Sequence, residues 1–244
     1  MNSRRHSWLH RRPAWRWPVW GAGLVVGVSA AFAQPSAAQP GAAAGGQQIA
    51  AQGTAAGVPA CASCHGARGE GAAAFPRLAG TGQGYLREQL DAFADGSRQS
   101  AVMQPFAQKL SPQERAAVAA YYSALPPPFT AQDPPTVAPG DRGAWLATRG
   151  RWRDQVPGCA QCHGPGGSGV GASFPPLAGL PAAYVLAQLQ AFKDGTRPGG
   201  PLGLMEMVAR KLGQADMEAV ASYYAALGAA PAQAAASAPQ GGRR

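Results

Sequence analysis

The sequence has little charge and few aromatic side chains for its 244 residues. Charged residues make up 14% and aromatic residues 8% of the chain, which contains 33 glycines and 23 prolines. At about 150 residues per domain, the length allows one or two domains and excludes both a peptide-sized scaffold and a large multidomain enzyme. The high loop content leaves each domain short of core-forming side chains, so we expect a large apolar cofactor to fill part of the interior.

Acidic residues are absent from residues 1–33, which hold five arginines and therefore more than half of the net charge of +9. A basic start, an apolar run and a small-x-small sequence ending at Ala33 predict a signal peptide over residues 1–33, cleaved after Ala33, and export to the periplasm. The apolar run is shorter than the roughly 20 residues that span a bilayer. Three tryptophans beside it leave an uncleaved membrane anchor, or peripheral membrane association, as the alternative. The remaining chain is too weakly basic to indicate binding of nucleic acid.

Beyond residue 33 the chain has only four cysteines and two histidines, and all six lie in two copies of one pattern. The pattern C-x-x-C-H attaches c-type haem, because the two thiols join the vinyl groups and the adjacent histidine reaches the iron. We therefore predict two covalently bound haem c groups. The thioether residues would be Cys61, Cys64, Cys159 and Cys162, and the first axial ligands His65 and His163.

Two other uses of paired cysteines are disfavoured by the same residues. A shared zinc site would join pairs that are too far apart in the sequence and would leave both histidines unexplained. Short C-x-x-C disulfides are reactive and seldom structural.

An internal repeat covers most of the chain. Residues 75–98 align with residues 174–197, and residues 101–125 align with residues 203–227. We therefore predict two tandem domains of one kind. The expected organisation is a signal peptide (1–33), a disordered tail (34–45), a first domain (46–125), a Pro-rich linker (126–140), a second domain (141–228) and a disordered C-terminal tail (229–244).

Each copy has the pattern of helices separated by long loops, and no alternating β pattern of useful length is present, so we predict an all-α fold. Tyr85, Leu90 and Phe93 share one helical face, and the second copy repeats them. Ser111 and Glu114 form a capping box for a later helix, whose counterpart has a weaker cap. Short first helices are expected over residues 47–52 and 142–148.

The second axial ligand of each iron is restricted by the missing histidines. A methionine, a lysine or a vacant position remains. Met103 and Met205 occupy equivalent places in the repeat, each in a predicted loop before the last helix, so they are the expected ligands. Met207 is the rival in the second domain, and core packing is the alternative role for any of these methionines.

The order C-x-x-C-H-G, FP-x-LAG, Y-x-x-x-QL-x-x-F-x-x-G-x-R, M-x-x-x-A-x-x-L and a terminal YY helix, all found twice, resembles the dihaem cytochrome c4 family over residues 46–227. The resemblance implies two tandem class I cytochrome c domains related by pseudo-twofold symmetry, each with His/Met iron, in a periplasmic electron carrier. The chain departs from that pattern at GRWRDQVPGC before the second haem motif and at PGGPLGLM in the second methionine loop. The implied haem ligand sets are Cys61, Cys64, His65 and Met103 in one domain, and Cys159, Cys162, His163 and Met205 in the other.

An iron with both axial positions filled exchanges single electrons and does not readily bind substrate. We therefore expect an electron carrier of a respiratory chain, not an enzyme, with periplasmic or membrane-bound redox proteins as donor and as terminal oxidase or reductase. The alternative is an electron-accepting haem subunit of a periplasmic oxidoreductase complex. A haem enzyme or gas-binding protein with one open iron is disfavoured, because no spare histidine is available for acid–base work.

Two similar domains on a short linker predict a quasi-isologous contact. We expect it to form through the loops around the haem motifs, with Tyr, Trp and Arg donors offsetting the haem propionates. Two independent units on a flexible linker are the alternative. Arg149, Arg151, Trp152 and Arg153 are expected to form a solvated face stabilised by Asp141 and Asp154, with a docking edge as the alternative.

Overall fold

The structure is a computed structural model that describes residues 40–128, 140–200 and 202–228. The predicted signal peptide, most of the predicted linker and the predicted C-terminal tail lie outside these residues. Within the described ranges the elements are helices, with no β-strand and only isolated bridges. The prediction of an all-α fold is therefore confirmed.

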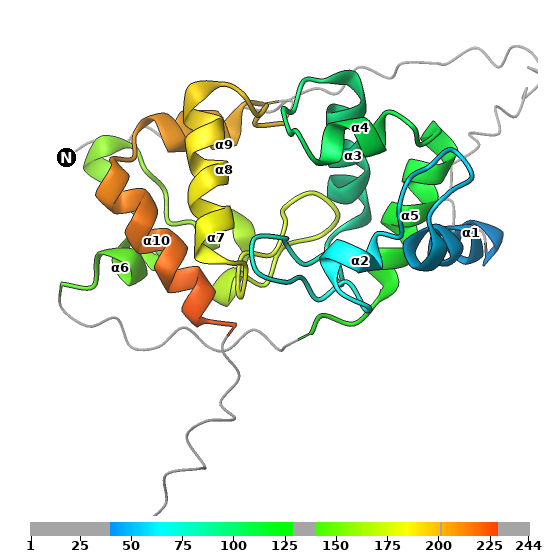
Figure 1. The fold of residues 1–244 in the computed structure, drawn as a ribbon. Helices are drawn as coiled ribbons and strands as arrows, with labels where there is room; N and C mark the ends of the chain where they lie inside the picture. Colours follow the sequence, from blue (N-terminus) through cyan, green and yellow to red (C-terminus); the bar gives the residue numbers. More distant parts are fainter. Residues whose placement is uncertain (1–39, 129–139, 201, 229–244) are drawn as a thin grey trace, which may run out of the picture. The chain divides into compact units, whose positions relative to one another are not determined.

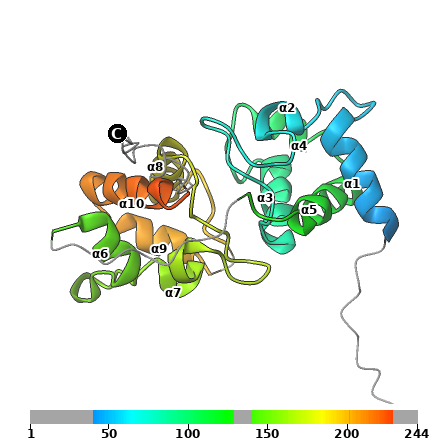
Figure 2. The same cartoon turned by 90° about the horizontal axis from the view of Figure 1, so that it is seen from below.

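The helices form two sets that repeat each other in order (Figure 1). The last helix of the second set, α10, packs against α6 and α8 (Figure 2). The first set is α1 (Pro40–Gln52), α2 (Ala62–His65), α3 (Gln83–Asp95), α4 (Met103–Ala107) and α5 (Pro112–Ala124). The second is α6 (Arg142–Thr148), η1 (Trp152–Asp154), α7 (Ala160–His163), η2 (Pro165–Gly167), α8 (Ala182–Asp194), α9 (Leu204–Arg210) and α10 (Gln214–Ala226).

Helix α1 begins earlier than the sequence pattern indicates. The helix was expected over residues 47–52, with residues 34–45 as a disordered tail, but it already begins at Pro40. Proline fits the first turn of a helix, where its missing N–H costs nothing. The alanines that follow have the highest helix propensity of all residues. Helix propensity and packing against α5 thus extend α1 toward its N-terminus, although the apolar pattern is confined to its C-terminal end.

The first and last helices of each domain cross at a glycine. A Cβ atom on Gly46 in α1 would lie 2.1 Å from the carbonyl oxygen of Ala117 in α5. The second domain repeats this contact, since a Cβ on Gly143 in α6 would lie 2.4 Å from the carbonyl oxygen of Ala219 in α10. The two backbones therefore approach closely enough that any side chain at these positions would force them apart.

The caps of the last helices differ between the domains. At α5 the predicted capping box is present: Ser111 Oγ accepts a hydrogen bond from the backbone N–H of Glu114, and the Glu114 carboxylate accepts one from the backbone N–H of Ser111. At α10 the residue before the helix is Gly213, so only half of the box forms, with the backbone N–H of Gly213 donating to Asp216. Asp216 therefore keeps oxygen lone pairs for other partners.

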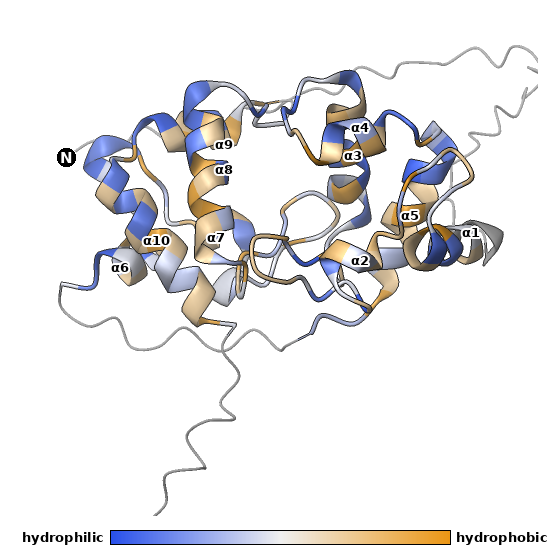
Figure 3. Cartoon of the chain, in the orientation of Figure 1, coloured by the Kyte–Doolittle hydropathy of each residue, from blue (hydrophilic) through white to orange (hydrophobic). Residues whose placement is uncertain are grey.

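Each domain has its own apolar core, which its helices enclose. Helix α8 presents mostly hydrophobic positions, drawn in orange in Figure 3. Tyr122 and Tyr224 are almost fully buried and pack against loop glycines that follow the two C-x-x-C-H motifs. A Cβ on Gly69 or on Gly167 would lie 2.6 Å from the neighbouring tyrosine ring. The last helix of each domain thereby holds the haem motif loop in place.

Across the described ranges, no helix combines the length and the hydropathy needed to cross a membrane.

The glycine crossing gives a matched pair of substitutions within one helix. Gly46→Ala should lower the stability of the haem-loaded protein by about 1–3 kcal/mol, because the new methyl group meets backbone atoms that are not free to move away. Gly45→Ala places the same methyl group where no atom lies within 4 Å. That variant should be neutral or up to about 1 kcal/mol more stable through helix propensity. Guanidinium unfolding measures both, and equal effects would show that the crossing does not depend on Gly46.

Candidate functional site

The histidine of each C-x-x-C-H motif is oriented by a proline carbonyl. His65 ends α2 and is buried, with its Nδ1 atom 2.8 Å from the carbonyl oxygen of Pro76. His163 ends α7 in the same way, 2.8 Å from the carbonyl oxygen of Pro175. A carbonyl oxygen only accepts hydrogen bonds, so Nδ1 carries the proton in each ring. The lone pair of Nε2 is therefore free to bind a metal, and the hydrogen bond fixes the direction in which it points.

Burial keeps both imidazoles neutral at pH 7. It lowers the pKa of His65 and of His163, and this effect exceeds the opposing effect of the hydrogen bond to the proline carbonyl. The edges of Phe75 and Phe174 pack near these rings, with ring centroids 6.0 Å and 6.3 Å apart. Neutral imidazole is the form that binds a metal ion.

Cys61 and Cys159 directly precede α2 and α7, and Cys64 and Cys162 lie within these helices. None of the four forms a disulfide. Burial raises the pKa of Cys61 and raises that of Cys159 to about 11. Reactive and metal-binding thiols have lowered pKa values instead. In the described parts of the chain, no three His, Cys, Asp or Glu side chains gather as a shared metal site would require. The structure thus favours neither thiol redox chemistry nor a common zinc site.

The methionines lie at the start of short helices and not in loops, as the sequence pattern had suggested. Met103 is the first residue of α4, and Met205 is the second residue of α9. Both are partly buried, and Met205 packs against the apolar core of its domain. Met207 is 54% exposed. The packing therefore favours Met205 over its rival as a residue that faces the interior.

The donor set of each domain fits a covalently attached haem. Each domain supplies two thiols three positions apart, an adjacent histidine whose Nε2 is available, and one partly buried methionine at the start of the helix before the last. These are the groups that c-type cytochromes use to attach haem and to ligate its iron.

Two arginines join the domains through reciprocal hydrogen bonds. Arg98, just after α3, donates to Gln89 Oε1 of its own domain at 2.8 Å. It also donates to two residues of the second domain, Gln188 Oε1 at 2.7 Å and the Tyr184 hydroxyl at 3.2 Å. Its guanidinium lies 4.3 Å from the ring centroid of Phe93.

Arg197, just after α8, makes the mirror set of contacts. It donates to Gln188 of its own domain at 2.9 Å, and across the contact to Gln89 at 2.9 Å and to the Tyr85 hydroxyl at 2.7 Å. Its guanidinium lies 4.3 Å from the centroid of Phe192. Each domain thus offers the other the same Tyr, Gln and Arg groups, which confirms the expected quasi-isologous contact.

The location of this contact differs from the expectation. We expected the loops around the haem motifs, but the arginines, glutamines and tyrosines belong to α3 and α8 or directly follow them. One haem motif loop takes part, since the carbonyl oxygen of Ala172 accepts a hydrogen bond from the Tyr85 N–H at 2.7 Å. The sequence G-x-R occurs at the same place in both copies of the repeat. An arginine repeated in this way was the signal that could have identified these residues.

The two arginines carry buried positive charge. Arg98 is 6% and Arg197 4% exposed, and the hydrogen bonds described above all go to neutral oxygens. Desolvation, and then the charge of Arg197, lowers the pKa of Arg98. Burying two like charges is costly unless anions balance them. The propionate carboxylates of haem are anions of the required kind, so this pair also fits a bound haem.

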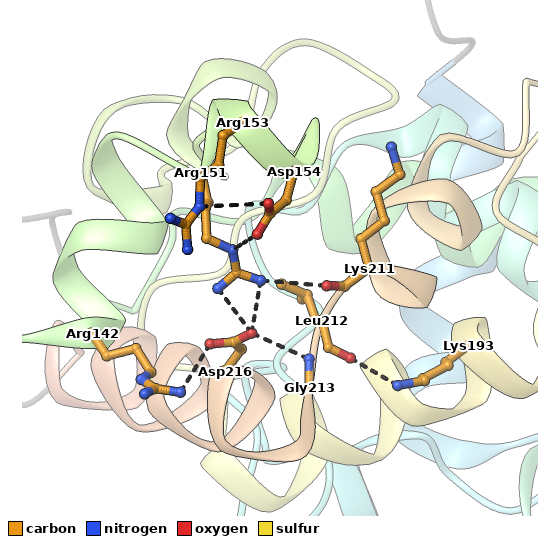
Figure 4. Close-up of polar contacts among 9 residues, drawn as sticks. All are labelled: Arg142, Arg151, Arg153, Asp154, Lys193, Lys211, Leu212, Gly213 and Asp216. Carbon is orange, nitrogen blue, oxygen red and sulfur yellow. Dashed lines mark hydrogen bonds and ion pairs between the residues drawn. The ribbon is translucent and has the colours of Figure 1, made fainter.

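In the second domain, the segment that precedes the haem motif is bound to a buried carboxylate, and the first domain has no such buried carboxylate (Figure 4). Asp216, 5% exposed, accepts hydrogen bonds from Arg151 Nη1 and Nη2, both at 3.1 Å, and from Arg142 Nη1 at 3.2 Å. Arg151 also pairs with Asp154, as expected. Asp141 instead caps α6 by accepting a hydrogen bond from the Ala144 N–H at 2.9 Å. The sequence pattern identified Asp216 only as a weak cap.

The arginines set the charge state of Asp216. Burial by itself raises its pKa, but the hydrogen bonds from Arg151 and from the Gly213 N–H, together with the charges of Arg151 and Arg142, outweigh that effect. The pKa of Asp216 is therefore lowered, and the carboxylate is ionised at neutral pH.

A family model described as cytochrome c matches residues 43–125 and 151–227, one match in each domain. Among known proteins, the chain is 50% identical to a thiosulfate dehydrogenase electron acceptor of Stutzerimonas stutzeri, over 76% of this chain and 88% of that protein. It is 48% identical to a protein of the same name from Thiomonas intermedia, over 72% of this chain and 82% of that one. It is 39% identical to cytochrome c4 of Pseudomonas aeruginosa, over 67% of this chain and 81% of that one.

Solved structures give the same grouping. A reduced recombinant cytochrome c4 from Pseudomonas stutzeri superposes with a TM-score of 0.64 at 34% identity, over 75% of this chain and 97% of that one. A thiosulfate dehydrogenase from Marichromatium purpuratum, in its as-isolated form, gives a TM-score of 0.67 at 46% identity. This chain matches over 75% of its own length but spans only 39% of that enzyme chain.

Removing the Asp216 charge tests its role in the second domain. Asp216→Asn should lower stability at pH 7 by about 1–3 kcal/mol, because two arginines lose a charged acceptor. An aspartate whose pKa is lower in the folded than in the unfolded protein stabilises the folded state at pH values above its unfolded pKa of about 4. This contribution is lost as the pH falls through the folded pKa. The gap between wild type and variant should therefore close in acid, as measured by guanidinium unfolding at several pH values.

Glu114→Gln is the matched control, because Glu114 holds the equivalent position in α5 and contributes only to the capping box. It should cost at most about 1 kcal/mol. A loss as large as that of Asp216→Asn, or a gap that does not change with pH, would contradict this role for Asp216.

Proposed function

Because the chain belongs to the dihaem cytochrome c4 family of c-type cytochromes, we propose that it carries single electrons between redox proteins with one covalently bound haem c in each domain. The observation that carries this proposal is the doubled site: two C-x-x-C-H motifs whose buried histidines are each held by a proline carbonyl with Nε2 free.

In the proposed sites, the chain's own residues attach the cofactor and determine what can reach it. When bound, haem c supplies an iron that gains or loses one electron. His65 and His163 offer Nε2 lone pairs in a fixed direction, and the methionine thioethers would be the second ligands, which would leave no position on the iron for water or substrate. The full sets are Cys61, Cys64, His65 and Met103 for one haem, and Cys159, Cys162, His163 and Met205 for the other.

Arg98 and Arg197 have two roles in this proposal. Their charge would offset the haem propionates, which would otherwise bring uncompensated negative charge into a partly dry contact. Their hydrogen bonds to Gln89 and Gln188 also hold the domains against each other. A fixed contact keeps the separation of the two haem sites constant, as electron transfer within one chain requires.

We further propose that the electron donor is a thiosulfate dehydrogenase. Two relatives named as electron acceptors of that enzyme are 50% and 48% identical to this chain, whereas the cytochrome c4 relatives are 35–39% identical. The chain would then accept electrons from the enzyme and pass them on without transforming a substrate itself. We place this transfer in the periplasm on the basis of the predicted signal peptide, residues 1–33.

The two-haem proposal predicts the mass of the exported protein. The intact mass should exceed that of the signal-cleaved polypeptide by two haems, and a pyridine haemochrome assay should give two haems per chain. Replacing Cys159 and Cys162 together with alanine should remove one haem and leave the spectrum of the first domain. A single haem on the unmodified chain would contradict the proposal.

The axial methionine of the second domain can be identified by paired variants. Met205→Ala should abolish one of two near-infrared methionine–iron bands and lower one midpoint potential, because a thioether favours ferrous iron. Axial ligands tune haem potentials over about 0.8 V, so a decrease on the order of 100 mV is expected. Met207→Ala, at an exposed residue of the same helix, should leave bands and potentials unchanged. The opposite result would make Met207 the ligand.

A further inference from the structure

The second domain exposes two tryptophans beside its haem motif. Trp145 in α6 is 51% exposed and Trp152 in η1 is 62% exposed. The guanidinium carbon of Arg149 lies 5.0 Å from the ring centroid of Trp145. Tryptophan and arginine are the residue types most enriched at the energetic centres of protein interfaces. We call the surface formed by Trp145, Arg149, Trp152 and Arg153 the Trp/Arg face.

The Trp/Arg face keeps a positive charge after its internal pairs are formed. Asp154 is engaged by Arg151 and, at 3.6 Å, by Arg153, whose side chain is 84% exposed. Lys211, exposed at the edge of this face, donates to the neutral Gln155 side chain at 2.7 Å. Arg149 contacts the Trp145 ring, and this cation–π contact does not neutralise the positive charge of Arg149. The face therefore presents cations around two apolar rings.

The first domain closes the corresponding turn without these side chains, although the second domain has one more residue there and forms η1. In the first domain the N–H of Thr54 donates to Val58, and in the second the N–H of Arg151 donates to Val156, at 2.9 Å and 2.7 Å. The residues equivalent to the four of the Trp/Arg face are Gln48, Gln52, Ala55 and Ala56. The first domain therefore serves as a comparison for the second, and at these positions the two domains differ in the charge and size of the side chains.

The segment that carries Trp152 and Arg153 is joined to the last helix of the domain by the Arg151 side chain. Arg151 connects η1 to the buried Asp216 of α10 through two hydrogen bonds, and its Nη2 lies 3.5 Å from the carbonyl oxygen of Lys211 (Figure 4). Lys193 of α8 donates to the carbonyl oxygen of Leu212 at 2.8 Å in the same region. Residues that are already ordered lose little entropy on binding, which favours affinity.

The face also adjoins the residues that attach the second haem. The thiol of Cys159 lies 3.9 Å from the carbonyl oxygen of Leu146, the residue after Trp145. Loop residues 155–158 connect η1 directly to Cys159, and Cys162 is exposed. A protein bound at this face would lie beside the second site.

From this composition, asymmetry and position, we infer that the Trp/Arg face of the second domain is the docking surface for a redox protein with an acidic surface patch, and that electrons enter through this domain. The inference rests on the proposed carrier function and names the partner's chemistry. An anionic membrane would also attract arginine and tryptophan, but it would repel the exposed Asp141 and Asp154 within the same surface. A protein patch can place neutral or basic groups opposite those two carboxylates, whereas a lipid surface cannot.

The test compares two double variants that change the net charge by the same amount at equivalent places of the two domains. Arg149→Gln with Arg153→Gln removes two positive charges from the second domain. Gln52→Glu with Ala56→Glu adds two negative charges at the matching positions of the first domain. Reduction of the oxidised, haem-loaded protein is followed by stopped flow with two donors: a thiosulfate dehydrogenase supplied with thiosulfate, and a reduced acidic blue-copper protein. The midpoint potentials of both haems are measured as well.

The second-domain variant should be reduced about tenfold more slowly at low salt, and the difference should vanish at high salt, because complementary charges act mainly on the association rate. Trp152→Ala should slow reduction at both salt concentrations. The first-domain variant should stay within about twofold of wild type, because its charges lie away from the docking face. All midpoint potentials should be unchanged, which separates docking from an effect on the haem.

The other outcomes are distinct. If both double variants slow equally, or neither slows, the docking inference is wrong. If the blue-copper protein reduces the two double variants at different rates while the dehydrogenase fails to reduce the wild-type protein, the docking face is supported and the proposed donor is wrong. If Trp152→Ala abolishes binding to phosphatidylglycerol vesicles while all reduction rates stay at the wild-type value, the face is a membrane surface and the inference is overturned.

Discussion

Two guanidinium groups of like charge are buried at the contact between the domains, and the arrangement of both sites depends on how they are balanced. Neutral oxygens of Gln89, Gln188 and two tyrosines satisfy their hydrogen bonds but do not cancel their charge. Such a pair is expensive in the polypeptide alone and becomes favourable when anions share the contact. In the proposed carrier, haem propionates would supply those anions, so attaching the cofactor and holding the domains together would be coupled through Arg98 and Arg197. An Arg-to-Lys exchange would not preserve this, because lysine lacks the planar fork that reaches several acceptors at once.

The repeat is strict where the fold needs it and relaxed where it does not. Histidines with their proline carbonyls, glycine crossings and buried tyrosines recur at equivalent positions, because each satisfies a geometric need of one domain. The last helix shows the opposite. Glu114 only completes a cap, whereas Asp216 at the equivalent position is buried under two arginines. A glycine at the preceding cap frees the carboxylate for that second use.

The sequence alone predicted the two domains and the helix with a good cap, and it placed the histidines that the structure shows buried, because each depends on residues close together in the chain. His65 and His163 follow from spacing, and the capping box at Ser111 follows from two residues three positions apart. The Arg98 and Arg197 contact depends on residues that are distant in the sequence, so only the repeated G-x-R hinted at it. The start of α1 at Pro40 was missed because backbone propensity and packing against α5, without an apolar pattern, extend that helix. The partners of Asp216 could not be predicted either, since Arg142 and Arg151 reach it from other elements.

A symmetric pair of sites gives electrons no preferred direction, so an electron carrier that serves two different partners must break its symmetry somewhere. In this chain the arginine contact between the domains is almost perfectly reciprocal and supplies no direction. The difference lies instead at the outer surface beside the second haem motif, where cations and two tryptophans replace glutamines and alanines. Because that surface is fixed to the helix framework through Arg151 and Asp216, its chemistry can diverge without disturbing the histidine and methionine positions beneath it. In the proposed carrier, the duplicated fold would separate two tasks: the repeated interior of each domain would hold its cofactor, and the unequal surfaces would determine which domain meets which partner.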